Sequence, residues 1–439
     1  MITALQNVFR IEELRTRILF SAAMIAVYRV GCIVVTPGIN GDVIRQFFES
    51  MSGTMFGLLN VFSGGAMESL SIFALGIMPY ISSSIIFQLL TIVIPALEKL
   101  KKEGSEGQKR ITQWTRYSTI GLALFQSFLM AMALENGQFG QGAVIVPGWA
   151  FRITTMITLT SGTAFIMWLG EQVTEQGIGN GVSLIIFAGI VERLPGASLG
   201  LIQLVKAEEI GLIKALIIVA VVLAVVLSVV WVETAQRKIP VQYAKRVVGR
   251  KMYGGASSFL PLKVDQSGVI AVIFAVSLMA VPMTIAQFTP NSPWAQKILD
   301  FLNRANPIYE LCYAALIVFF CYFYNSVSIN PTDLAENMKK SGGFVPGMRP
   351  GEPTAKYIEW VLDRITLGGA LFVAAVAVLP TLLRSVYNVP FYLGGTSLLI
   401  VEGVALDTMG QLEAHLIMRH YEGFLKGGRI RQRWFNVGN

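Results

Sequence analysis

The chain has 439 residues, of which 54% are hydrophobic and only 14% are charged, with a formal net charge of +8. A soluble globular protein carries closer to a quarter charged residues, and a chain of this size cannot keep so much apolar surface away from water in its own core. The composition therefore excludes an ordinary soluble protein and indicates that much of the surface faces lipid.

The sequence is poor in residues that bind metals or form disulfides. Its cysteines, Cys32, Cys312 and Cys321, all lie in apolar runs, and its two histidines, His415 and His420, stand close together near the C-terminus. A closed metal site needs several such ligands at short spacing, and a disulfide framework needs paired cysteines in polar loops. We expect no metal site, no disulfide framework and no cofactor.

Ten apolar runs follow one another along the chain. A membrane-spanning helix needs about 20 mostly apolar residues. The fifth run is short and is expected to continue past Pro195, and the first is read as a retained span because no small-residue cleavage site follows it. The sequence thus predicts an all-α membrane protein with ten transmembrane helices, at 18–35, 71–94, 117–134, 154–169, 182–191, 212–232, 269–288, 307–324, 365–383 and 393–412.

The basic residues predict the orientation. With the N-terminus inside, the cytoplasmic segments hold about 26 of the 35 Lys and Arg residues, as the positive-inside rule requires, so both termini are predicted to be cytoplasmic. Two basic cytoplasmic loops, about 233–266 and 325–364, are longer than simple connections. Topology alone explains part of their charge. The sharper interpretation is that they bind a large cytosolic partner.

Catalytic patterns are missing from the sequence. It has no HExxH, no GxSxG and no pair of carboxylates within a predicted span, which argues against an enzyme and against an intramembrane protease in particular. The GIGNG run at 177–181 lacks the full pattern of a phosphate-binding loop. We interpret it as a tight cytoplasmic turn that enters the fifth span.

Two further features leave alternatives open. The run 62–71 is too short and too polar to span a membrane, and it could be a re-entrant half-helix or an external loop; composition alone favours the loop. Ile81 and Ile85 share one helix face, as do Ile186 and Ile190. Periodicity does not decide whether these faces meet the core, lipid or a pore.

Several long motifs are similar to the SecY family of protein-conducting channels. They occur in the order typical of that family and together cover nearly the whole chain. The motifs are NVFSGGAMESLSIFALGIMPYISSSIIFQLL from Asn60, KKEGSEGQKRITQWTRY from Lys101, EQGIGNGVSLIIFAGI from Glu175, RKIPVQYAKRVVGRKMYGGASSFLPLKV from Arg237, NPTDLAENMKKSGGFVPGMRPG from Asn330 and FYLGGTSLLIV from Phe391.

The resemblance implies two pseudo-symmetric halves of five helices each, 1–201 and 202–439, around a central pore, with a hinge near 200–211. It also implies that the segment at about 61–71 is a re-entrant plug half-helix that seals the outer funnel, which replaces the external-loop interpretation. The plug positions are Phe62, Ser63, Gly64, Gly65, Ala66, Met67, Glu68 and Ser69.

The resemblance also assigns the pore and its sideways exit. A ring of aliphatic side chains is expected at the waist, and a lateral gate between the second and third spans and the seventh and eighth opens the pore to lipid. Gln88 and Gln126 match this gate. The ring positions are Ile81, Ile85, Ile186, Ile190 and Ile273.

The cytoplasmic loops match the surfaces on which this family binds the SecA motor ATPase and translating ribosomes. The family also assembles with two small membrane subunits, SecE and SecG, acts on signal sequences and unfolded polypeptides, releases apolar segments into lipid, and resides in the bacterial cytoplasmic membrane. The matching docking positions are Arg237, Lys238, Lys245, Arg246, Arg250, Lys251 and Arg349.

Four positions depart from the family pattern. Ala271 replaces a common proline, Asp265 a common asparagine, and Ala405 a larger aliphatic at an expected ring position, while Glu402 introduces a carboxylate into the tenth span. An intramembrane carboxylate is a functional hypothesis by default. Glu402 keeps open an alternative function, an ion-coupled secondary transporter of a small solute.

Overall fold

The computed structural model describes residues 11–50, 60, 63–207, 211–243, 246–248, 251–253, 257–287, 293, 297–298, 301, 307–387 and 395–427. The predicted plug residue Phe62, the docking residues Lys245 and Arg250, and both chain termini lie outside this part of the chain. So do residues 208–210 of the predicted hinge.

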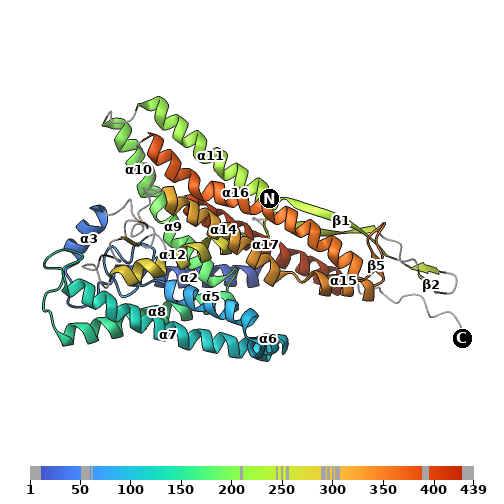
Figure 1. The fold of residues 1–439 in the computed structure, drawn as a ribbon, viewed down its shortest axis with the longest axis horizontal. Helices are drawn as coiled ribbons and strands as arrows, with labels where there is room; N and C mark the ends of the chain where they lie inside the picture. The colour runs from blue at the N-terminus through green and yellow to red at the C-terminus, as the bar shows by residue number, and fades with distance from the viewer. Residues whose placement is uncertain are drawn as a thin grey trace, which may run out of the picture.

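The described part is mostly helical, and its helices run side by side as a bundle (Figure 1). The first half of the chain contributes α2 (Glu12–Ile33), α3 (Gly41–Ser50), α5 (Met78–Val93), α6 (Pro95–Lys102), α7 (Ser105–Glu135), α8 (Trp149–Gln176), α9 (Gly181–Val191) and α10 (Arg193–Lys206). The second half contributes α11 (Leu212–Thr234), α12 (Val269–Gln287), α14 (Pro307–Ser328), α15 (Pro331–Lys340), α16 (Glu352–Tyr387) and α17 (Gly395–Gly427).

Each of the ten apolar runs overlaps a helix, although fewer helices qualify as complete spans. Seven in the described part are long and apolar enough to cross a membrane, or up to eight if α5 and α6, which bend by 100° at Pro95, form one span. The prediction that the fifth run continues past Pro195 is confirmed, because α9 and α10 together form one 26-residue candidate span. The chain is therefore a multi-pass helical membrane protein.

Close backbone contacts within the bundle depend on glycines. A Cβ atom added at Gly162 in α8 would overlap the carbonyl oxygen of Ile72, and one added at Gly181 would overlap the carbonyl oxygen of Gly170. Small residues of this kind let backbones approach closely in membrane bundles. At the start of α9, Asn180 accepts hydrogen bonds from the backbone N–H groups of Val182 and Ser183, so the GIGNG run is a capped turn, as predicted.

The all-α prediction is confirmed for the bundle, but both long loops also contain short strands that were not predicted. β1 (Gln236–Tyr243) pairs antiparallel with β4 (Ser257–Lys263), and β5 (Gly343–Phe344) pairs with the other edge of β1. β2 (Arg246–Val248) pairs with β3 (Lys251–Tyr253). Within β1, Ile239 and Val241 are buried while their neighbours are exposed, which is the period-two pattern of a half-buried strand.

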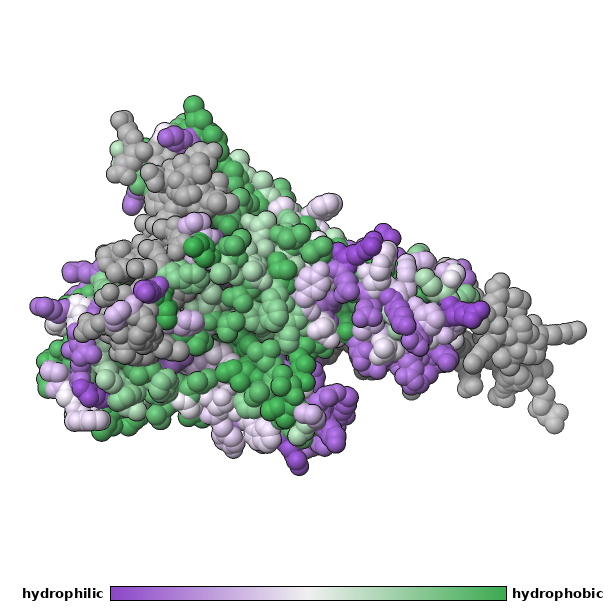
Figure 2. All heavy atoms as spheres, in the orientation of Figure 1, coloured by the Kyte–Doolittle hydropathy of each residue, from purple (hydrophilic) through white to green (hydrophobic). Residues whose placement is uncertain are grey.

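The surface is divided along the long axis of the molecule. Hydrophobic side chains cover the middle of the visible face, while hydrophilic ones gather at the end that carries the strands and α15 (Figure 2). The turn at α6 points to this same end (Figure 1). The basic segments predicted to be cytoplasmic, around 99–116, 236–263 and 331–350, therefore share one end of the bundle.

Candidate functional site: an isoleucine constriction, a turn segment and a basic end

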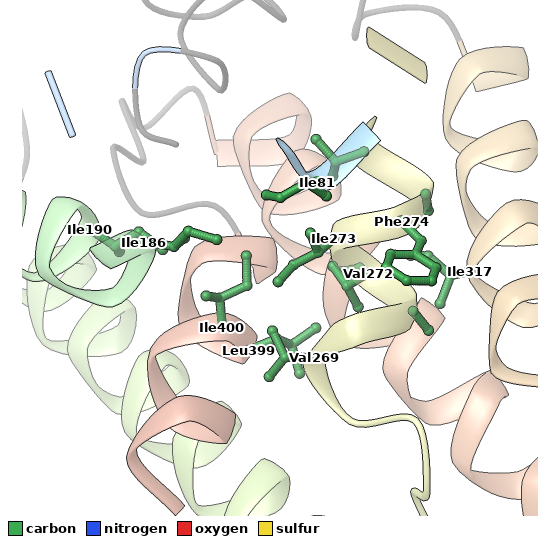
Figure 3. Packing of buried hydrophobic residues seen from close by; sticks show 14 of the residues in the cluster. Ile81, Ile186, Ile190, Val269, Val272, Ile273, Phe274, Ile317, Leu399 and Ile400 are labelled. Atoms are coloured by element: carbon green, nitrogen blue, oxygen red, sulfur yellow. The ribbon is translucent and has the colours of Figure 1, made fainter. Parts of the chain in front are cut away.

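The five predicted ring residues come together in one buried cluster. α5 carries Ile81 and Ile85, which are 6% and 5% exposed, and α12 carries Ile273, which is 7% exposed. α9 carries Ile186 and Ile190, each 1% exposed. Figure 3 shows Ile186 and Ile81 converging on Ile273 from three different helices.

The helices that hold this cluster belong to both halves of the chain. α5 from the first half packs against α12, and α9 from the first half packs against α17. α12 and α17 also contact each other. The five isoleucines therefore lie where the two halves of the chain meet. The side chains that face one another there are all apolar.

One further isoleucine lies among the predicted ring residues and was not predicted. Ile400 of α17 is fully buried, belongs to the same cluster, and points between Ile186 and Ile273 (Figure 3). Ala405, which was expected at a ring position, is outside that cluster and is half-buried. Ile400 lies five residues earlier on α17, and it supplies the larger aliphatic side chain that Ala405 lacks.

The predicted plug half-helix is not helical in its described residues. Residues 63–77 form successive turns and one β-bridge residue. Five of these turns are closed by i→i−3 hydrogen bonds, in which the N–H groups donate to carbonyls three residues earlier: Ala66 to Ser63, Glu68 to Gly65, Leu70 to Met67, Ala74 to Ser71 and Gly76 to Phe73. The left-handed backbone at Gly64, Gly65 and Leu70 prevents a regular helix, because consecutive right-handed dihedrals are needed to build one.

This turn segment is docked in the bundle beside the constriction. Ala66 is completely buried in the same cluster as the ring isoleucines. Ser71 forms a β-bridge with Val35, and the carbonyl of Leu70 accepts a hydrogen bond from Thr36 N–H at 3.0 Å. The segment is thus an ordered part of the fold that follows α2 and leads into α5.

The two predicted gate glutamines lie on neighbouring helices of the first half. Gln88 is half-buried on α5, where its amide donates to Ser84 Oγ at 3.3 Å, and Gln126 is half-buried on α7. α5 packs against both α7 and α12. The α5–α12 contact joins the two halves of the chain, and it lies at the predicted gate.

Three of the predicted basic docking residues lie on one folded unit. A small apolar core joins β1, β4, the turn before α16 and α16 itself, through Ile239, Leu262, Val345 and Ile358. Around it, Arg237 and Lys238 are exposed on β1, and Arg349 is exposed in the turn, where its carbonyl accepts from Thr354 Oγ1 at 2.8 Å. Arg246 lies on β2 and Lys251 on β3, which form a separate two-stranded sheet. The pairing of β1 with β5 and the shared apolar core therefore bring Arg237 and Lys238 of the first long loop and Arg349 of the second onto the same unit.

Two of the departures from the family pattern have a local explanation. Asp265 stabilises the turn that precedes α12, because its Oδ1 accepts hydrogen bonds from Ser267 N, Ser267 Oγ and Gly268 N at 2.8–3.1 Å. Ala271 is fully buried in the main cluster, where a small side chain fits. Glu402 is buried on α17, and neither carboxylate oxygen has a hydrogen-bond partner among the described residues.

Comparison with known proteins identifies this architecture. The SecY family model matches residues 71–409, which is more than half of the chain. The chain belongs to the SecY family. It is 47% identical over 422 residues to the protein translocase subunit SecY of Escherichia coli strain K12, covering 95% of each chain, and 48% identical over 440 residues to that of Streptomyces galbus, covering 97% of this chain and all of the relative.

Solved structures agree on the SecY fold. The chain superposes on a structure described as a protein conducting channel with a TM-score of 0.64 at 17% identity, and on Sec61 from a canine ribosome-channel complex with a TM-score of 0.63, also at 17% identity. Each match covers 95% of both chains. The predictions of SecY family membership and of a channel subunit that is not an enzyme are confirmed.

Proposed function

We propose that the chain is a passive conduit through which unfolded secretory polypeptides cross a membrane, and from which apolar segments leave sideways into lipid. One observation carries this proposal: in a chain of the SecY family, isoleucines from both halves belong to one buried apolar cluster, which we interpret as the closed constriction of the pore. A narrow apolar constriction excludes water and ions when closed. Such a constriction also does not select among translocating polypeptides by the chemistry of their side chains.

The remaining parts of the site fit around this constriction. Residues 1–201 and 202–439 act as the two halves of the channel, each with five spans in the complete ten-span topology. The turn segment 63–77 acts as the plug, since Ala66 is buried in the same apolar cluster as the ring isoleucines. Separation of α5 from α12 would open the lateral gate, because this contact joins the halves next to Gln88. Apolar segments then partition into lipid, because the transfer of apolar side chains from water into the membrane is favourable.

The basic end of the molecule is the proposed docking surface for partners that supply energy. Arg237, Lys238 and Arg349 are exposed there on one folded unit. Charged partners of opposite sign are steered to such a patch. We assign it to the SecA motor and the translating ribosome, with the docking face and both termini on the cytoplasmic side of a bacterial inner membrane. SecE and SecG would complete the membrane complex.

A reconstituted translocation assay tests the proposal. The purified complex of this chain with its small membrane subunits is placed in lipid vesicles with the motor ATPase, ATP and a radiolabelled unfolded secretory protein. Protection of that protein from added protease supports the conduit. A complex that instead takes up a small solute without the motor, and protects no polypeptide, would support the transporter alternative.

A further inference from the structure

A cluster of charged residues binds the turn segment to α2 and to the junction of α9 and α10. Arg29 lies in α2, about one turn before the helix ends at Ile33, and it is the one charged residue of positions 18–33. Its Nη1 donates to the carbonyl of Gly64 at 2.8 Å, its Nη2 donates to the carbonyl of Ala188 at 3.3 Å, and it forms an ion pair with Glu192. One guanidinium therefore joins the turn segment to the end of α9.

A second ion pair lies one residue further along the same junction. Arg193 Nη2 is 3.2 Å from Glu68 Oε2, and Glu68 belongs to the turn segment. Asn60 holds Glu68 from the other side, since its Nδ2 donates to Oε2 at 3.0 Å and its Oδ1 accepts from the Glu68 N–H at 3.1 Å. Both ionic contacts thus end at adjacent residues, Glu192 and Arg193.

This junction is directly connected to the constriction. Glu192 and Arg193 follow Ile190, a ring residue, by two and three positions. A Cβ atom added at Gly64 would lie 3.2 Å from Gly189 Cα and 2.5 Å from Tyr28 Oη, so the turn segment sits against the backbone of α9. A movement of α9 that widens the ring must displace the groups that hold the turn segment.

The structure assigns to Arg29, Glu68, Glu192 and Arg193 the role of an ionic latch that positions the turn segment and couples its release to α9. This inference rests on the proposed function of that segment as the plug. Each of the two contacts pairs one positive with one negative side chain, so the net charge of each pair is zero while the channel is closed. Opening separates them, and charge-assisted hydrogen bonds at partly buried sites are stronger than neutral ones. The latch therefore stabilises the closed channel.

Conductance of the intact complex in planar bilayers tests the latch. Glu68 and Arg193 are each about one-third exposed, so Glu68→Gln and Arg193→Gln should leave the fold intact. Each is expected to raise the fraction of time that an idle channel conducts by about three- to tenfold. The charge swap of Glu68→Arg with Arg193→Glu should return conductance toward the wild-type level, which a merely structural role would not do.

A matched control and a reference deletion make the outcomes distinct. Glu135→Gln removes another ion pair of the first half, with Arg152, and should leave conductance unchanged. Deletion of residues 60–70 should raise it. If the deletion raises conductance but both single variants stay at the wild-type level, the latch is refuted while the plug survives. If the deletion also has no effect, the plug function itself fails.

Discussion

Polar replacement of two ring isoleucines should make the closed channel leak ions. Ile81 and Ile186 are 6% and 1% exposed, so Asn at either position would be almost fully desolvated when the channel is closed. An amide buried without a partner costs about 1–3 kcal/mol in proteins. In the open, hydrated channel, water satisfies that amide and the cost disappears. The double variant Ile81→Asn with Ile186→Asn therefore shifts the balance toward the open state.

The size of the shift follows from the same argument. The two amides can bond partly to each other, so we take about 1.4–2.8 kcal/mol for the pair instead of the full sum. Since 1.4 kcal/mol is a factor of ten, the open fraction should rise by about 10- to 100-fold while it remains small. Conductance per channel in planar bilayers measures it. Secretion of proteins with defective signal sequences should also increase, because opening needs less help from the signal.

A buried isoleucine away from the ring provides the control. Ile317 of α14 is fully buried in the same cluster, and Figure 3 draws it beside Phe274, on the far side of α12 from Ile186. Ile317→Asn should lower the amount of protein in the membrane without raising the leak of each channel. The reasoning is wrong if the double ring variant accumulates normally and conducts like the wild type, or if it behaves like the control.

Three further outcomes are expected. Arg349→Glu should cut motor-driven secretion severalfold at normal protein levels, since Arg349 is exposed on the docking unit; loss of the protein from the membrane would indicate a structural role instead. Gly162→Ala should reduce thermal stability of the purified complex by about 1–3 kcal/mol, because its Cβ meets the Ile72 carbonyl, and an unchanged melting temperature would contradict that packing. A single cysteine placed beside Arg431 should resist impermeant thiol reagents in intact cells, whereas ready labelling would reverse the predicted topology.

The sequence predicted the helices well because lipid imposes a simple length and hydropathy rule. Every apolar run overlaps a helix, and even the short fifth run extends as expected. The motif resemblance then predicted ring positions that periodicity alone left open, and these isoleucines belong to one buried cluster. The shared face of Ile81 and Ile85 is the same whether it meets lipid or a pore. Only the packing of α5 on α12 distinguishes the two.

Three features were not predicted from the sequence. The strands of the first long loop are stabilised by Val345 and Ile358, about 100 residues further along the chain. The turn segment is not a half-helix, because Gly64, Gly65 and Leu70 adopt left-handed backbone. Ile400 was overlooked because α17 is apolar on several faces, and the packing of α17 against α9 fixes which of its residues meets the ring isoleucines. Long-range packing decided the first and third cases, and local backbone conformation decided the second.

The most direct test of the central claim is to ask which residues a translocating polypeptide touches. A photoreactive amino acid is placed at Ile400, in the constriction, or at Ile157, which is 62% exposed on the outer face of α8. A secretory polypeptide is then stalled halfway by a folded domain at its C-terminus, and the complex is illuminated. The conduit predicts crosslinks from position 400 and none from position 157. Equal crosslinking at both positions, or none at 400, would contradict a path through this constriction.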